Sequence, residues 1–354
     1  MTKLFSPLKI KGITLKNRIG VSPMCQYTSI DGFANQWHLV HLGSRAVGGA
    51  SLIIAEATAV SPEGRISPKD LGIWKDEHIE KLSEITAFIK ENGSVAGIQL
   101  AHSGRKGSTM APTEGYGTVS IESGGWNPVA PSPLPYSENY PQPIELSVEG
   151  IKKVVDDFKT AAKRALQSGF EIIEIHASHG YLLHQFLSPL SNQRKDDYGG
   201  SFENRIRLLL EVVNAVKSEL PEESPLFVRI PATDWVNGGW ETNDAIRLTS
   251  ILKNEGVDVV DVTTGGLSHE QKIPVGPGYQ TPFASKIKKE TGMLTATVGM
   301  ITNAAQAEYI LVNEDADIIL LAREFLRNPY FPLTAASELG EDISWPAQYN
   351  RAKL

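Results

Sequence analysis

The chain of 354 residues is 41% hydrophobic and 21% charged, and its formal net charge is −7. This composition is typical of a soluble globular protein, and the negative charge argues against a nucleic-acid or anionic-membrane surface. A single cysteine, Cys25, excludes an internal disulfide framework and any four-cysteine iron–sulfur or zinc site within the chain. The sequence has neither a membrane-length apolar run nor a signal-peptide core, so we expect a cytoplasmic protein without nucleic-acid or membrane partners.

Strand-like and helix-like segments alternate along the chain. Eight short apolar segments rich in β-branched residues have the length of buried strands. In chain order they are 18–22, 51–55, 95–100, 170–175, 226–230, 257–262, 294–298 and 317–321. Segments with helical spacing lie between them, at 36–47, 76–91, 147–168, within 202–219, 243–254, near 282–291, and after residue 302. Ser147 and Thr302 are the expected N-caps of two of these helices.

This alternation implies a parallel sheet. Eight strand–helix units over this length favour an α/β fold of the closed (β/α)8 TIM-barrel type over an open doubly wound sheet. No G-x-G-x-x-G motif follows a strand, so the open dinucleotide-binding sheet would lack its phosphate turn. We therefore predict a TIM barrel.

The passage from about residue 101 to about residue 146 interrupts the alternation after the third strand. Its many Gly, Pro and Ser residues disfavour regular structure, but its aromatic residues disfavour a disordered linker. We expect an ordered insertion over one end of the barrel, and a C-terminal extension at about 340–354. The whole of 1–354 is then predicted to be one domain.

Two histidines and a tyrosine follow the fourth strand, in the stretch FEIIEIHASHGY that ends at Tyr181. Ligands of parallel α/β folds bind at the carboxyl ends of the strands, so His176, His179 and Tyr181 are candidate site residues. Two histidines could ligate a metal in a hydrolase, which would require a third ligand. Glu56 is the only carboxylate near another strand end that could be this third ligand.

The other strand ends favour a flat, phosphorylated cofactor. The last two strands end in Val-Gly-Met at 298–300 and Leu-Ala-Arg at 321–323, and small residues with an arginine suit a phosphate. Gln99 offers a donor and an acceptor for the edge of a ring system, and Arg229 can stabilise negative charge on a reduced flavin. Together these residues describe a site for FMN.

Five motifs carry a resemblance to the old yellow enzymes, the FMN-dependent ene-reductases. They are SPMCQY (22–27), EATAV (56–60), QLAHSGRK (99–106), HASHGYLLHQFLSPLSNQRKDDYGGSFENR (176–205) and VGMI (298–301). Cys25 with Tyr27, the region of Arg323, and the ending 346–351 resemble the subgroup of xenobiotic reductases and thermophilic-like enzymes.

The resemblance implies a ping-pong reaction in which NADPH or NADH reduces FMN, leaves, and is replaced by an activated alkene. His176 and His179 match the pair that binds the substrate oxygen, and Tyr181 matches the proton donor. Tyr27 would line the substrate pocket, and Cys25 would contact the flavin and adjust its potential. The positions that match FMN contacts are Ser22, Pro23, Met24, Cys25, Ala57, Gln99, Arg229, Gly299, Met300, Ala322 and Arg323.

Two positions qualify the resemblance. Ala322 stands where the family has glycine before the phosphate-binding arginine, and its methyl group is tolerable if the residue is not at positive φ. Arg351 aligns with an arginine that, in this subgroup, reaches the active site of a neighbouring subunit, which implies a homodimer or homotetramer.

Three alternatives stay open at the level of the sequence. The first is a related flavin barrel such as a dienoyl-CoA reductase, although the cysteine cluster of that group is absent here. The second is a metal-dependent hydrolase that uses His176 and His179. The third is a flavin-binding barrel that senses redox state through Cys25 without turning over an alkene.

Overall fold

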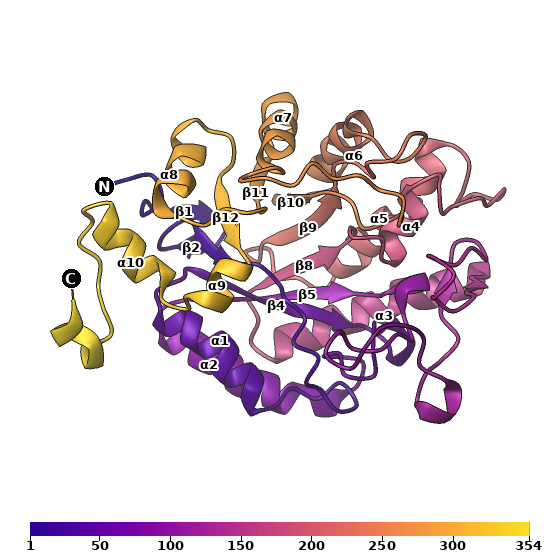
Figure 1. The fold of residues 1–354 in the computed structure, drawn as a ribbon, viewed down its shortest axis with the longest axis horizontal. Coiled ribbons are helices and arrows are strands. Elements are labelled where there is room, and N and C mark those ends of the chain that lie inside the picture. Colours follow the sequence, from indigo (N-terminus) through magenta and orange to yellow (C-terminus); the bar gives the residue numbers. More distant parts are fainter. Residues whose placement is uncertain (354) are drawn as a thin grey trace.

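The computed structural model describes residues 1–353, and at its centre is a closed barrel of eight parallel strands (Figure 1). Around the ring these are β3 (Ile19–Val21), β4 (Leu52–Ala59), β5 (Val95–Ala101), β8 (Ile172–His176), β9 (Leu226–Pro231), β10 (Val259–Thr263), β11 (Leu294–Thr297) and β12 (Ile318–Leu321). Each strand pairs with the next along the chain, and β12 pairs with β3 to close the ring. The predicted (β/α)8 TIM barrel is confirmed.

Helices connect the barrel strands and cover the outside of the ring (Figure 1). The longer ones are α1 (Gln36–Val47), α2 (Ile79–Glu91), α3 (Val148–Gln167), α5 (Phe202–Lys217), α6 (Thr242–Asn254), α7 (Thr281–Thr291) and α8 (Ala304–Val312). Shorter helices are α4 (Leu182–Leu187), α9 (Arg323–Arg327) and α10 (Phe331–Glu338). All seven predicted helices are present.

One of the two predicted helix caps is wrong. Ser147 caps α3 as expected, because its hydroxyl accepts a hydrogen bond from the Gly150 N–H at 3.1 Å. Thr302 does not cap α8. The cap is the next residue, Asn303, whose extended backbone lets its side-chain oxygen accept from the Gln306 N–H at 2.8 Å.

The barrel strands are buried on both faces. On β8, Ile172 packs inside the barrel with Phe227, whereas Ile173 and Ile175 belong to the larger cluster between strands and helices. An antiparallel hairpin, β1 (Leu8–Ile10) and β2 (Ile13–Leu15), precedes the barrel. Its buried residues Ile10 and Leu15 join the same interior cluster, so the hairpin covers the N-terminal end of the barrel.

The segment between β5 and α3 contains little regular structure. Its elements are 3-10 turns at Gly104–Lys106 and Ile121–Ser123 and the parallel pair β6 (Val129–Ala130) and β7 (Ile144–Glu145). Arg194, from the long motif after β8, donates to the Pro131 carbonyl at 3.1 Å and to the Leu146 carbonyl at 2.6 Å. These hydrogen bonds tie the segment to the rim of the barrel.

The C-terminal part of the chain passes along one edge of the molecule. A 3-10 turn at Ala347–Ala352 ends it, near α10 (Figure 1). The hydroxyl groups of Tyr330 and Tyr349 lie 3.4 Å apart and connect this turn to the start of α10. Between residues 1 and 353, no helix combines the length and the apolar character needed to cross a bilayer.

Candidate active site

A layer of polar side chains lies inside the barrel, above the apolar layer. Gln99 Nε2 donates to Glu174 Oε1 at 2.7 Å, and Arg229 Nε lies 2.9 Å from Asp261 Oδ2. All four side chains are buried, and Glu174 Oε2 has no hydrogen-bond partner among the described residues. Burial and the charge of Asp261 raise the pKa of Glu174 to about 8, so this carboxyl group holds a proton at neutral pH.

Sequence reasoning missed Glu174 and Asp261. Each is the single charged residue in an otherwise apolar strand, and that pattern is the signal that could have found them. Glu174 lies two positions before His176, so the period of a strand places both on the inner face. Asp261 is the register partner of Arg229 on the neighbouring strand.

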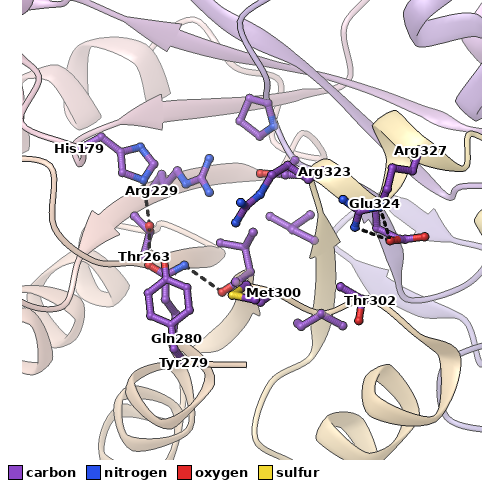
Figure 2. Close-up of a pocket in the computed structure, with 17 residues that line it drawn as sticks. His179, Arg229, Thr263, Tyr279, Gln280, Met300, Thr302, Arg323, Glu324 and Arg327 are labelled. Atoms are coloured by element: carbon purple, nitrogen blue, oxygen red, sulfur yellow. Dashed lines mark hydrogen bonds and ion pairs between the residues drawn. The ribbon is translucent and has the colours of Figure 1, made fainter. Parts of the chain in front are cut away.

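A cavity of 320 Å³ opens at the mouth of the barrel (Figure 2). The predicted residues that line it are Ser22, Pro23, His179, Arg229, Gly299, Met300, Ala322 and Arg323. Figure 2 shows Arg229 and Arg323 pointing into the cavity toward each other. Within residues 1–353, the guanidinium group of Arg323 has no hydrogen bond or ion pair, whereas that of Arg327 is paired with Glu324 at 2.6 Å. A guanidinium group without a partner suits an anionic ligand.

The backbone after β11 forms one wall of this cavity. Gly299 has φ +129°, and a Cβ there would lie 3.0 Å from Tyr279 Cε1. Met300 also has positive φ, at +51°. Gln280 holds this wall, since its Nε2 donates to the Val298 carbonyl at 2.9 Å. This wall, which forms a cradle for a ligand at Gly299 and Met300, therefore depends on a backbone conformation that favours glycine.

Ala322 meets the condition set by the sequence. Its φ is −111°, so its methyl group causes no left-handed strain. The condition on φ is therefore met, and the ψ of −92° lies outside the usual helical and extended regions.

His176, His179 and Tyr181 lie side by side at the end of β8. The two imidazole centroids are 5.2 Å apart with an interplanar angle of 87°, and the rings of His176 and Tyr181 are 5.0 Å apart. His179 has φ +58° and Gly180 has φ +73°, and this tight turn brings the three side chains together. The predicted clustering of these three residues is present in the structure.

A line of hydrogen bonds defines the tautomers of the two histidines. The Ser178 N–H donates to His176 Nδ1 at 3.4 Å, which leaves the His176 proton on Nε2. That Nε2 lies 3.4 Å from His179 Nδ1, and His179 Nε2 lies 2.9 Å from Thr263 Oγ1. The Thr263 hydroxyl in turn donates to Gln280 Oε1 at 2.9 Å, so it accepts from His179.

Burial keeps the ring side chains uncharged. It lowers the pKa of His176 and His179 well below the usual value, and the nearby charge of Arg229 lowers both further. Burial also raises the pKa of Tyr181 well above its usual value, so the phenol keeps its proton. No third His, Cys, Asp or Glu in residues 1–353 is arranged with the histidines to hold a metal ion.

The turn after β8 packs directly on the loop after β10. A Cβ on Gly180 would lie 2.1 Å from the Gly266 carbonyl oxygen, and a Cβ on Gly266 would lie 2.7 Å from His179 Cα. His184 Nδ1 accepts from the Gly180 N–H at 2.9 Å, and its Nε2 lies 2.8 Å from Asp234 Oδ1. The two loops therefore form one rigid support for the histidine pair.

The loop after β3 carries Cys25 and Tyr27. Glu56, at an irregularity in the pairing of β4, accepts a hydrogen bond from the Gln26 N–H at 2.7 Å and holds this loop. Burial, followed by the charges of Asp70 and Glu56, raises the pKa of the Cys25 thiol. A neutral thiol is a poor nucleophile, which disfavours the redox-sensor alternative.

A second cavity, of 440 Å³, lies under the insertion. Tyr27 and Tyr181 both line it, and Lys106 of the QLAHSGRK motif lies between the insertion and the turn after β8. The remaining lining residues are Ile66, Thr109, Met110, Pro112, Gly115, Tyr116, Gly117, Ser137, Asn139 and Tyr140. Tyr181 faces this cavity and His179 faces the first one, so the cluster after β8 joins the two.

The other predicted residues occupy different places. Gln99 belongs to the buried polar layer, and Ala57 is buried in β4. Met24 is partly buried and packs against the main hydrophobic cluster. Arg351 is exposed in the C-terminal turn and lines neither of the two cavities.

Comparison with known proteins identifies the family. The model of the NADH:flavin oxidoreductase / NADH oxidase family matches residues 3–342. The chain belongs to this family. An NADPH dehydrogenase of Bacillus pumilus is 51% identical over 353 residues, and one of Listeria innocua is 49% identical over 354 residues. Each of these alignments covers 99% of both chains.

A solved structure agrees with this assignment. Morphinone reductase matches with a TM-score of 0.80 and 28% identity, over 98% of this chain and 91% of that chain. The resemblance to the old yellow enzymes is confirmed, and this flavin oxidoreductase uses FMN with a nicotinamide as hydride donor. The unpartnered Arg323 and the cradle at Gly299, which a Cβ would narrow, fit a cofactor that ends in phosphate.

Proposed function

We propose that this flavin oxidoreductase reduces the activated C=C bond of α,β-unsaturated carbonyl and nitro compounds in a ping-pong cycle. The observation that carries the proposal is the contact between His176, His179 and Tyr181, which joins the cofactor cavity to the second cavity. When bound, FMN accepts a hydride from NADPH or NADH and passes it to the alkene. The surrounding side chains then have to hold the substrate oxygen and supply a proton.

Two groups of residues would hold FMN. Arg323 and the backbone at Gly299 and Met300 suit the phosphate, because a free guanidinium group and exposed N–H groups bind phosphate oxygens. Arg229 and Gln99 suit the ring system. The proposed contact set is completed by Ser22, Pro23, Met24, Cys25, Ala57 and Ala322.

The two histidines would hold the substrate oxygen. The contact of 3.4 Å between His176 Nε2 and His179 Nδ1 is long, so an incoming oxygen can accept the His176 proton in its place. His179 donates to Thr263 at 2.9 Å and must turn away from that hydroxyl to become the second donor. Two neutral N–H donors stabilise the negative charge that develops on the substrate oxygen.

Tyr181 would supply the proton. Its hydroxyl keeps its proton at neutral pH because burial raises the pKa, and its ring lies against His176. A substrate whose oxygen binds the histidines extends toward Tyr181, which protonates the α-carbon. Tyr27 lines the same cavity and would contact the substrate.

Replacement of Tyr181 by phenylalanine tests this proposal. Stopped-flow absorbance should show that Tyr181→Phe leaves flavin reduction by NADPH within about twofold, whereas reoxidation by an enone slows by about a hundredfold, which is the usual contribution of a general acid. Tyr309→Phe is the control, because Tyr309 is 67% exposed on α8. Equal slowing of the two half-reactions would remove Tyr181 as proton donor. Failure of every enone, maleimide and nitroalkene to reoxidise the flavin would overturn the function.

We also propose that residues 1–354 form one cytoplasmic domain that assembles as a homodimer or homotetramer. The exposed position of Arg351, which lines neither cavity of its own chain, supports a role at the site of a neighbouring copy. Light scattering of the purified protein distinguishes the two assemblies from a monomer.

A further inference from the structure

Lys106 lies at the seam between the catalytic turn and the insertion. Its Nζ donates to the His179 carbonyl at 2.9 Å and to the Gly266 carbonyl at 2.8 Å. The same ammonium group lies 4.6 Å from the ring centroid of Tyr136 and 5.4 Å from that of Tyr181. Two carbonyl oxygens and two aromatic faces form a pocket for a cation.

The position of this ammonium group is fixed by the loops that hold it. The carbonyl of His179 belongs to the turn after β8, and that of Gly266 to the loop after β10. These loops are in direct backbone contact, because a Cβ on Gly180 would lie 2.1 Å from Gly266 O. Lys106 therefore cannot move relative to Tyr181 without breaking both of its hydrogen bonds.

No carboxylate in the described part of the chain pairs with Lys106. The ionisable groups around it are Arg105 from its own turn, Tyr136 from the insertion, and His176, His179 and Tyr181 from the turn after β8. Tyr27 and Tyr140 line the same cavity. Burial, with a smaller effect of Arg105, lowers the pKa of Lys106 to about 7.

We propose that Lys106 is a positioning residue that strengthens Tyr181 as an acid, because its ammonium group stabilises the negative charge left on the tyrosine oxygen when the proton departs. This inference rests on the proposed function, in which the proton passes from Tyr181 Oη to the α-carbon of the alkene. The O–H bond of Tyr181 breaks as the C–H bond forms, and solvent entering the second cavity reprotonates the oxygen. The charge of Lys106 does not change in the step.

The predicted signature is a dependence of the alkene half-reaction on pH. Below about pH 7 Lys106 is charged and the half-reaction is fast, and above it the neutral amine gives a slower reaction, by about tenfold for a charge at this distance. Stopped-flow reoxidation of the reduced enzyme by an enone, measured from pH 5.5 to 8.5, gives this profile. Lys106→Met should be about tenfold slower at pH 6 and lose the pH dependence. Lys106→Arg should stay within about threefold of the parent at pH 6 and also lose it.

Two controls separate charge from shape. Lys152→Met removes an exposed lysine of α3 and should leave both half-reactions and the pH profile unchanged. In the parent holoenzyme, NMR of [13Cε]-lysine, assigned with Lys106→Arg, should show one lysine that titrates near the midpoint of the rate profile. This measurement does not depend on the folding of the methionine variant. A Lys106 signal whose midpoint differs from that of the rate profile would overturn the assignment of the pH dependence to Lys106.

The double variant distinguishes this inference from the proposed function. In a Tyr181→Phe background, Lys106→Met should have no further effect on the alkene half-reaction, because the acid that it assists is gone. Equal slowing of both half-reactions by Lys106→Met, or equal slowing by the methionine and arginine variants, would show a purely structural role and overturn the inference. An alkene half-reaction unaffected by Tyr181→Phe would instead refute the proton donor of the proposed function.

Discussion

The two sides of the barrel mouth recognise their ligands with different chemistry. On the histidine side (His176, His179, Tyr181 and Thr263), the ligand is recognised by side chains that are linked by hydrogen bonds and ring contacts. On the phosphate side (Gly299, Met300, Ala322 and Arg323), the backbone conformation matters most, and Arg323 adds a charge without a partner in residues 1–353. The side chains of the histidine side are linked to one another before a substrate binds, and His179 has to exchange its hydrogen bond to Thr263 for one to the substrate. The phosphate side is completed by its ligand.

The largest effect is expected on the histidine side. The double variant His176→Ala and His179→Ala should raise the dissociation constant of a phenol by about a hundredfold, because two hydrogen bonds to its oxygen are lost. The long-wavelength absorption that accompanies phenol binding should weaken in parallel, while FMN content stays near that of the parent. His269→Ala is the control, since His269 is exposed. An unchanged phenol titration would remove the pair from substrate binding.

On the phosphate side, a smaller effect should fall on the cofactor alone. Arg323→Ala should raise the dissociation constant of FMN by about thirtyfold, which corresponds to one charge-assisted hydrogen bond. Arg327→Ala should change it by less than about threefold, because Arg327 is already paired with Glu324. Fluorescence titration of the apoprotein with FMN measures both. The comparison of the two sides fails if Arg323→Ala also weakens phenol binding to the reconstituted enzyme.

The smallest effect is expected at Ala322. Ala322→Gly should leave the dissociation constant of FMN within about twofold, because φ −111° is not in the left-handed region that favours glycine. The melting temperature should fall slightly, since glycine increases the conformational freedom of the unfolded chain. Tightening of FMN binding by more than about tenfold would show that the methyl group obstructs the phosphate.

The same contrast explains what the sequence could predict. The barrel followed from the alternation of apolar runs and amphipathic segments, which depends on local periodicity. The histidine side could be predicted because the residue types of His176 and Tyr181 indicate their chemistry and both residues lie in one motif. The predicted N-cap of α8 was wrong by one residue. Thr302 and Asn303 are both good capping residues, and only the backbone conformation decides between them.

The rest of the site depends on long-range packing. In the sequence, Glu174 is one polar residue in a buried strand. Only the closed barrel shows that it accepts a hydrogen bond from Gln99. Lys106 lies in a recognised motif, yet its role depends on two carbonyl groups that are about 73 and 160 residues away in the chain. The positive φ of Met300 gives no signal in residue type, because methionine rarely adopts it.

The hairpin β1–β2 has a consequence for ligand traffic. Ile10 and Leu15 seal the floor of the barrel against the interior cluster, so the barrel resembles a cup with a single rim. In the proposed cycle, a nicotinamide and an alkene would use this one opening in turn. Substitutions at the rim can therefore alter ligand binding without touching the apolar cluster at the base of the barrel.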